Sequence, residues 1–171
     1  MKLKTPTLPY SITPGKMICL ALFFLLFSCG NNGFTDYIHD HEGILSRDQV
    51  ENLDEELAEH HRKTGNELVF VTTTDFEKSE NIEDFAKMYG DRIGVGGSEK
   101  KGVVFVVSES RNEMFILTGK GVVHSLNDDK VREIIHLNIM PHFKQGEYYN
   151  GIRYGILRII RVLENRETEF I

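Results

Sequence analysis

Cysteine is scarce in this sequence, and both of its cysteines lie near the start. The 171 residues contain Cys19, Cys29 and no other cysteine. From residue 30 onward the chain therefore has no disulfide and no thiol nucleophile, which excludes thiol chemistry as an activity. Acidic residues are also absent before Cys29, whereas Lys2, Lys4 and Lys16 make this first segment positively charged.

The sequence also lacks a long hydrophobic run. Its longest apolar stretch, Met17–Phe27, has eleven residues. Eleven helical residues rise only about 16 Å, whereas a bilayer core needs roughly 20 apolar residues. A short apolar run that follows a positive segment is typical of a secretory signal rather than of a transmembrane helix.

A small residue and a cysteine end the apolar stretch, in the order Leu26-Phe27-Ser28-Cys29. This segment resembles the lipobox of bacterial lipoproteins, and the resemblance implies cleavage before Cys29 and lipidation of its thiol. We predict a signal peptide at 1–28, a flexible tether at 29–36, a domain at 37–165 and a C-terminal tail at 166–171. The protein is expected to be exported and membrane-anchored, facing the periplasm, because Gly30-Asn31-Asn32-Gly33 lacks the acidic run of some surface-export signals.

The negative net charge of the chain limits the classes of partner that it can bind. Residues 1–28 carry three lysines and no acid, so their removal lowers the formal net charge from −6 to −9 and leaves 143 residues, enough for one domain. An acidic surface argues against binding to nucleic acid or to anionic lipid. Membrane attachment is therefore expected from the acyl chains on Cys29, at about 0.8 kcal/mol per buried CH2. Envelope proteins are possible partners, and the sequence leaves the oligomeric state open.

Helix and strand signals alternate after the tether. Ser46 and Gln49 form a capping box, and Gly65 is a C-terminal cap, so a helix is expected between them. A second helix directs Ile82, Phe85, Ala86 and Tyr89 inward and stops near Gly90. Strands are predicted at 68–74, 102–107 and 114–118. After Asn127, two closing helices are expected, with Pro141 ending or kinking the first.

The order strand, helix, strand predicts a βαβ unit with a right-handed crossover. The first two predicted strands should be parallel, and the third should return antiparallel to the second through a turn at 108–112. The fold class is therefore α/β, a small mixed β-sheet built on a βαβ unit and flanked by helices.

Several short segments recur in a recognisable order and spacing over roughly residues 37–163. They are Asp40…Gly43-Ile44-Leu45-Ser46, Thr64-Gly65-Asn66-Glu67, Lys101-Gly102-Val103-Val104, Gly119-Lys120-Gly121-Val122, Leu126-Asn127-Asp128 and Pro141-His142-Phe143. Together they resemble the TPM-domain family, the thylakoid-lumen phosphatase-like group and its bacterial relatives. This chain departs from the family by lacking a tryptophan before Ile93 and by having Val123 where a glutamate is usual.

The resemblance implies a divalent metal, Ca²⁺ or Mg²⁺, bound by acidic loop residues, and a phosphatase activity proposed for some members. Carried onto this sequence, the candidate ligands are Asp40, Asp75, Asp128 and Asp129, and Arg111 is the candidate phosphate-binding residue. The chemistry is reasonable, because these cations prefer clustered oxygen ligands and phosphoryl transfer needs positive charge. Asp75 and Arg111 follow the first two predicted strands, at the edge where ligands collect in open α/β sheets.

Simpler roles compete with these. Asp128 and Asp129 would favourably occupy the first turn of a helix, Asp40 could cap a turn, and Arg111 could simply be solvated at a hairpin tip. His39 and His41 alternate with acids, but two histidines without a third ligand do not define a zinc site.

Two functions from different classes remain open. One is a metal-stabilised, non-catalytic module that binds envelope proteins and supports their assembly or turnover. The other is a metal-dependent phosphatase-like hydrolase of phosphomonoesters. The sequence favours the binding module, because it shows no Ser/His/Asp or Cys/His constellation and no nucleophile beside the acids.

Overall fold

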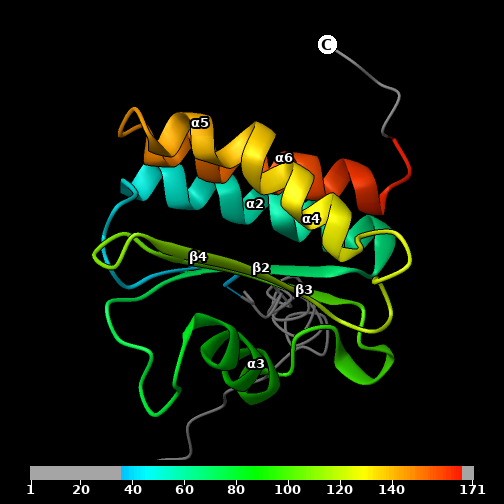
Figure 1. The fold of residues 1–171 in the computed structure, drawn as a ribbon. Coiled ribbons are helices and arrows are strands. Elements are labelled where there is room, and N and C mark those ends of the chain that lie inside the picture. The colour runs from blue at the N-terminus through cyan, green and yellow to red at the C-terminus, as the bar shows by residue number, and fades with distance from the viewer. Residues whose placement is uncertain (1–35, 167–171) are drawn as a thin grey trace, which may run out of the picture. The chain divides into compact units, whose positions relative to one another are not determined.

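A four-stranded mixed sheet with helices on both faces forms the core of the computed structural model, which describes residues 36–166 (Figure 1). The strands are β1 (Ile38–Asp40), β2 (Glu67–Thr72), β3 (Gly102–Ser108) and β4 (Glu113–Thr118), in the order β1-β2-β3-β4. β1, β2 and β3 are parallel, whereas β4 is antiparallel to β3. The expected α/β class and the predicted strand directions are confirmed.

Helices cover the two faces unequally (Figure 1). One face carries α2 (Arg47–Thr64), α4 (Asp128–Ile134), α5 (Met140–Phe143) and α6 (Tyr148–Leu163), with a π-helical segment, η2 (Ile135–Ile139), between α4 and α5. The other face carries α3 (Ile82–Ile93), and a short 3-10 turn, η1 (Gly97–Glu99), precedes β3. Within residues 36–166, no helix is long and apolar enough to cross a membrane.

The first helix has the ends that the sequence predicts. The Ser46 hydroxyl accepts from the N–H of Gln49, and the Gln49 side chain accepts in return from the N–H of Ser46. Gly65 ends the helix in the left-handed conformation, with φ of 71°. These local contacts stabilise both termini of α2.

The second helix is longer than predicted, and the expectation that it stops near Gly90 is wrong. It runs to Ile93 and ends at Gly94, whose N–H donates to the Gly90 carbonyl (2.9 Å). Gly90 instead faces the sheet, where an added Cβ would lie 3.0 Å from Cγ2 of Val104. This glycine therefore permits close packing of α3 rather than ending the helix.

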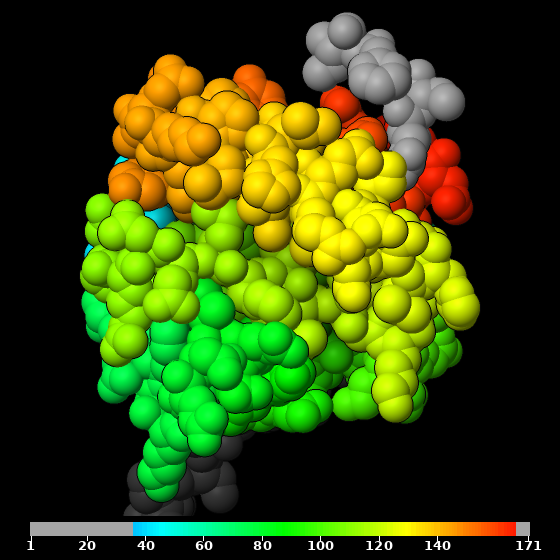
Figure 2. Space-filling model, in the orientation of Figure 1, coloured from blue at the N-terminus to red at the C-terminus, as the bar shows by residue number. Residues whose placement is uncertain are grey.

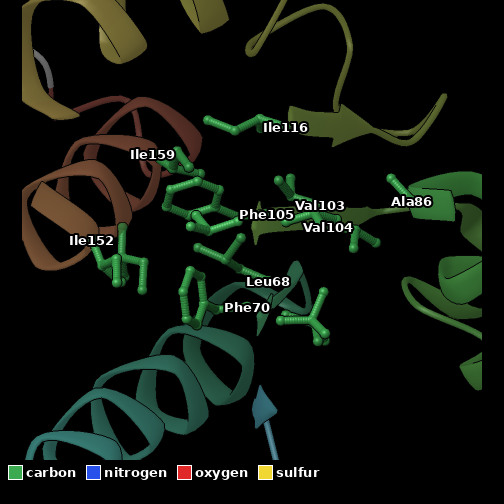
Figure 3. Packing of buried hydrophobic residues seen from close by; sticks show 14 of the residues in the cluster. Leu68, Phe70, Ala86, Val103, Val104, Phe105, Ile116, Ile152 and Ile159 are labelled. Carbon is green, nitrogen blue, oxygen red and sulfur yellow. The ribbon is translucent and has the colours of Figure 1, made fainter. Parts of the chain in front are cut away.

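The core lies between the sheet and the larger helical layer. The Phe70 and Phe105 rings meet edge to face, with centroids 5.1 Å apart, and Ile152 and Ile159 of α6 lie near them (Figure 3). Val104 faces the opposite side, toward Ala86 of α3 (Figure 3). All six of these side chains are buried.

The predicted disturbance at Pro141 appears as a widened turn. The N–H of Met140 donates to the carbonyl of Ile135, five residues earlier, and Pro141 follows directly. Because proline has no N–H and its ring crowds the carbonyl four residues before it, a π-turn here lets the helical path continue.

The N-terminal predictions lie outside the described residues. These are the signal peptide at 1–28, the tether at 29–36 apart from Asp36, and the lipidation residue Cys29. The predicted tail at 166–171 is described only at Arg166.

Candidate functional site at the carboxyl edge of the sheet

The three parallel strands end at one edge of the sheet, which we call the carboxyl edge. Asp40 ends β1 beside Thr72 at the end of β2, and β3 ends at Ser108. Because parallel strands share a direction, the loops that follow them gather at this edge, where α/β folds commonly bind ligands. Of the predicted site residues, the structure brings Asp40, Asp75 and Arg111 to the carboxyl edge.

Asp40 is held in a dense set of hydrogen bonds. Its Oδ1 accepts from the Thr72 hydroxyl (2.6 Å) and from the N–H groups of Gly43 (3.1 Å) and Ile44 (3.3 Å). Its Oδ2 accepts from the N–H of Leu45 (2.8 Å). The Asp40 carboxylate therefore folds the chain between β1 and α2 into a turn and fastens that turn to β2.

Glu42, which was not among the predicted site residues, also holds loops together through its carboxylate. We call a carboxylate that does this a clamp, so Asp40 is the first clamp and Glu42 the second. Its carboxylate accepts from the N–H groups of Glu109 (2.8 Å) and Ser110 (3.2 Å) and from the Ser110 hydroxyl (2.8 Å). Its own N–H donates to the Thr72 hydroxyl (2.9 Å). The side chain joins the loop after β1 to the loop after β3. Glu42 lies two residues after Asp40, which ends β1, and this position is the sequence signal that could have indicated a role for Glu42 at the site.

Asp75 and Arg111 lie on the loops beyond these clamps. Asp75 Oδ1 accepts from the N–H of Glu77 (3.0 Å). The Arg111 Nε donates to the Thr74 carbonyl (3.1 Å), and its guanidinium carbon lies 4.5 Å from the centre of the Phe76 ring. Both residues are exposed, so they present opposite charges at the surface of the carboxyl edge.

Helix α4 begins near the ends of the parallel strands that lie opposite the carboxyl edge (Figure 1). The chain that leaves β4 runs beside the entry to β3, with Gly119 N–H donating to the Gly102 carbonyl (2.8 Å), and α4 begins nearby. Asp128 and Asp129 occupy the exposed first turn of α4, and Asp129 pairs with Arg132. The structure therefore does not bring Asp128 and Asp129 together with Asp40 and Asp75.

The donor set does not fit a resident cation shared by these aspartates. Within residues 36–166, no three His, Cys, Asp or Glu side chains converge as metal ligands do. Asp40 turns both carboxylate oxygens toward main-chain and hydroxyl donors, whereas a hard cation needs several oxygens aimed at one point. The Asp40 carboxylate serves the turn instead.

The His39-Asp40-His41-Glu42 segment is likewise used within the fold. One ring nitrogen of His39 bonds the Tyr89 hydroxyl, and the other lies 2.8 Å from the Asp36 carbonyl oxygen. Burial raises the pKa of Tyr89. The His39 ring therefore connects β1 with α3.

A small apolar hollow, which we call the hairpin hollow, adjoins the carboxyl edge. It has a volume of about 190 Å³. Its apolar lining comes from the β3–β4 hairpin and from the region of α5 and α6, namely Val107, Met114, Met140, Phe143 and Tyr148. At its rim, the Tyr148 hydroxyl donates to Glu109 Oε1 (3.2 Å). Desolvation and this carboxylate raise the pKa of Tyr148.

The fold and the sequence together define the class of protein. Residues 38–162 match the TPM domain, so the chain belongs to the TPM-domain family. No curated protein is similar enough in sequence to match the chain.

Solved structures share the fold. The N-terminal domain of a protein from P. gingivalis is 29% identical, with a TM-score of 0.70 over 77% of this chain and 84% of that one. The BA42 protein of Bizionia argentinensis is 20% identical, with a TM-score of 0.62 over 74% and 86% of the two chains. The N-terminal domain of cg2496 from Corynebacterium glutamicum is 10% identical, with a TM-score of 0.59 over 84% and 88%. The last two likenesses show the fold alone.

Proposed function

We propose that this TPM-domain protein is a lipid-anchored, non-catalytic module of the bacterial cell envelope that binds other envelope proteins. The observation that carries the proposal is the use of Asp40 and Glu42 as main-chain clamps. Carboxylates that hold loops in place stabilise a rigid edge and are poorly available as metal ligands or as a general base. A rigid edge that presents Asp75 and Arg111 suits recognition of a protein surface.

The lipid anchor at Cys29 is part of this proposal. Acyl chains supply the membrane attachment, since removal of residues 1–28, with their three lysines, lowers the net charge from −6 to −9 and leaves little attraction for anionic lipid. Cys29→Ser should move the protein from the membrane fraction to the soluble fraction. Retention of the Cys29→Ser variant in washed membranes would contradict the anchor.

The second candidate is a phosphatase-like hydrolase. Arg111 favours it to a degree, because a guanidinium held at a sheet edge is a suitable phosphate contact. Hydrolysis also needs an activated nucleophile, and the Ser110 hydroxyl donates to a Glu42 carboxylate already occupied by two N–H groups. That arrangement leaves Glu42 poorly suited to remove the hydroxyl proton.

One experiment distinguishes the two candidates. A photoreactive amino acid is placed at Asp75 on the carboxyl edge, and at the exposed Glu55 of α2 as the control. The binding proposal expects a discrete protein adduct in intact cells from position 75 and none from position 55. In parallel, highly purified protein should hydrolyse p-nitrophenyl phosphate at the background rate. Turnover that persists through purification and disappears in a variant carrying both Asp40→Ala and Asp128→Ala would establish the enzyme instead.

A further inference from the structure

One edge of the sheet ends in an apolar strand. In residues 36–166, β4 is the last strand of the sheet and pairs only with β3. Its centre is Met114-Phe115-Ile116-Leu117, in which Ile116 is buried and the other three are partly buried. An open apolar edge is a template for another strand unless charge, proline or a bulge protects it.

The direction of the main-chain groups of β4 follows from its pairing with β3. Gly119 N–H donates to the Gly102 carbonyl, which makes Gly102 and Gly119 a hydrogen-bonded pair. Such pairs alternate along an antiparallel ladder. The N–H and C=O groups of Phe115 and Leu117 therefore point toward β3, and those of Met114, Ile116 and Thr118 point to the outer edge.

Apolar hollows flank β4 on its two faces. The hairpin hollow includes Met114 and lies on the face that carries α5 and α6. A second hollow of about 130 Å³ includes Leu117 and Gly90 and lies on the face that carries α3. Figure 2 shows this side of the molecule, where β4 reaches the surface between α4 and α3.

The spacing of the hollows matches an extended peptide. Met114 and Leu117 are three residues apart, and residues an odd number apart in a strand point to opposite faces. A strand added beside β4 would direct one side chain into the hairpin hollow and another, three positions away, into the hollow at Leu117. Each hollow has room for about one apolar side chain, which is the scale of an interface anchor.

The charges at the two ends of β4 specify the charges that an antiparallel partner strand would carry. Glu109 and Glu113 lie at the rim of the hairpin hollow, beside Lys144. Lys87 and Lys100 lie at the rim of the other hollow, beside Asp91. The first residue of an antiparallel partner would lie beside the lysines at the end of β4, and its last residue would lie beside the glutamates at the start of β4. An acidic first residue and a basic last residue would therefore complement these charges.

We propose that β4 binds an extended segment of a partner protein by strand addition, with apolar side chains at positions i and i+3, an acidic residue before them and a basic residue after them. The proposal rests on the proposed function, a protein-binding module, and names the chemistry of the partner. The β4 strand of a second copy carries a similar pattern, with Glu113 before Met114 and Leu117 and Lys120 after them. That strand is flanked by helices, whereas a single extended segment needs only the space along the edge, and pairing with a second copy is an outcome that the test distinguishes.

A labelled hexapeptide tests the proposal. Glu-Leu-Thr-Thr-Leu-Lys has the required spacing and charges, and Glu-Thr-Leu-Thr-Leu-Lys has the same composition with both leucines on one face. Fluorescence anisotropy should show tighter binding of the first peptide. Equal binding of the two peptides, or binding of neither, would overturn the proposal.

A matched pair of variants tests the main-chain contact. Thr118→Pro removes an outward N–H without removing a bond to β3, and edge strands tolerate such prolines. Thr118→Ala loses the same side chain but keeps the N–H. Thr118→Pro should weaken binding of the first peptide about three- to tenfold, the range expected for one hydrogen bond, while Thr118→Ala changes it less than about twofold. Thermal melts of both variants check that the fold is intact.

Two results would refute strand addition without refuting the binding module. One is equal affinity of the proline and alanine variants for the peptide. The other is a concentration-dependent dimer that Thr118→Pro abolishes in a protein that binds neither peptide, since β4 would then pair with a second copy. In either case an adduct from position 75 would still support the binding module, and its absence would count against that module instead.

Discussion

Substitution of Asp40 should destabilise the protein to the same extent with and without divalent cations. The carboxylate accepts from three consecutive N–H groups, those of Gly43, Ile44 and Leu45, and from the Thr72 hydroxyl. Asp40→Ala removes all of these acceptors at once. If the clamp is the role of Asp40, the loss is a property of the fold and does not depend on a metal.

The magnitude follows from the two shortest contacts. A hydrogen bond to a charged group contributes about 1.5–3 kcal/mol, less where water can replace the lost partner. The bonds from Leu45 N–H (2.8 Å) and the Thr72 hydroxyl (2.6 Å) come from buried residues, whereas Gly43 is exposed. We therefore expect the free energy of unfolding to fall by about 2–4 kcal/mol. With an unfolding entropy of about 0.28 kcal/mol/K for a domain of this size, the Tm should fall by roughly 7–14 °C.

The assay is a thermal melt followed by circular dichroism, in EDTA and then in added Ca²⁺ or Mg²⁺. Asp128→Ala is the matched control, because that aspartate sits in an exposed helix turn, where its charge is worth about 0.3–1 kcal/mol. Thr72→Val and the double variant with Asp40→Ala should show a coupling energy above about 0.5 kcal/mol. A Ca²⁺-dependent rise in the Tm of the wild type that both Asp40→Ala and Asp128→Ala abolish would refute the clamp and restore the metal site.

Three further predictions concern the interior. Gly96→Ala should destabilise the domain more than Gly94→Ala does, as measured by urea unfolding. Both glycines have positive φ, but only a Cβ at Gly96 would meet the backbone, 2.2 Å from the Gly102 nitrogen. Equal losses of unfolding free energy in the two variants would contradict the packing argument. Burial lowers the pKa of His60, so the unfolded chain binds more protons than the folded chain below about pH 6.5. The free energy of unfolding should therefore fall as the pH drops through that value. The same pH dependence in His60→Gln would contradict this role of His60. Burial raises the pKa of Asp54, so stability associated with its protonated form is lost as pH rises above about 3.9. Asp54→Asn should therefore remove that loss, and an unchanged pH profile would reject the assignment.

The parts of the fold that could be predicted are those decided by neighbouring residues. The ends of α2 depend on Ser46, Gln49 and Gly65, all within one turn of the helix termini, and each behaves as its type predicts. The strands β2 and β3 are runs of β-branched and apolar residues long enough to be distinctive. The order of these elements then fixes parallel pairing through the crossover rule.

The parts that could not be predicted depend on contacts between distant residues. β1 has three residues, too few for an apolar pattern, and it exists because Ile38 and Asp40 pair with Phe70 and Thr72. Gly90 has the sequence signature of a helix end, yet the approach of Val104 from β3 gives it a packing role. A glycine alone does not show which of these roles applies.

The candidate site illustrates the same limit at the level of chemistry. A family resemblance can indicate which aspartates are candidate metal ligands. Whether such a carboxylate is available to a metal depends on how many hydrogen-bond donors the fold directs at it. Asp40 precedes a turn in which the N–H groups of Gly43, Ile44 and Leu45 point back at its carboxylate. Asp128 and Asp129 instead occupy the exposed first turn of α4.

The distribution of unused hydrogen-bonding groups argues for recognition through the main chain. At the carboxyl edge, Asp40 and Glu42 together accept from five N–H groups and two hydroxyls, so the loops there are internally satisfied. At β4 the situation is reversed, because three residues direct their N–H and C=O groups away from β3 beside two apolar hollows. Buried polar groups demand partners, and an edge strand flanked by apolar side chains satisfies that demand best with another strand. The carboxylates of Asp40 and Glu42 thus hold the loops of the carboxyl edge together. Of the two edge strands of the described sheet, β1 has three residues and β4 has six, so β4 is the longer template for a strand pair.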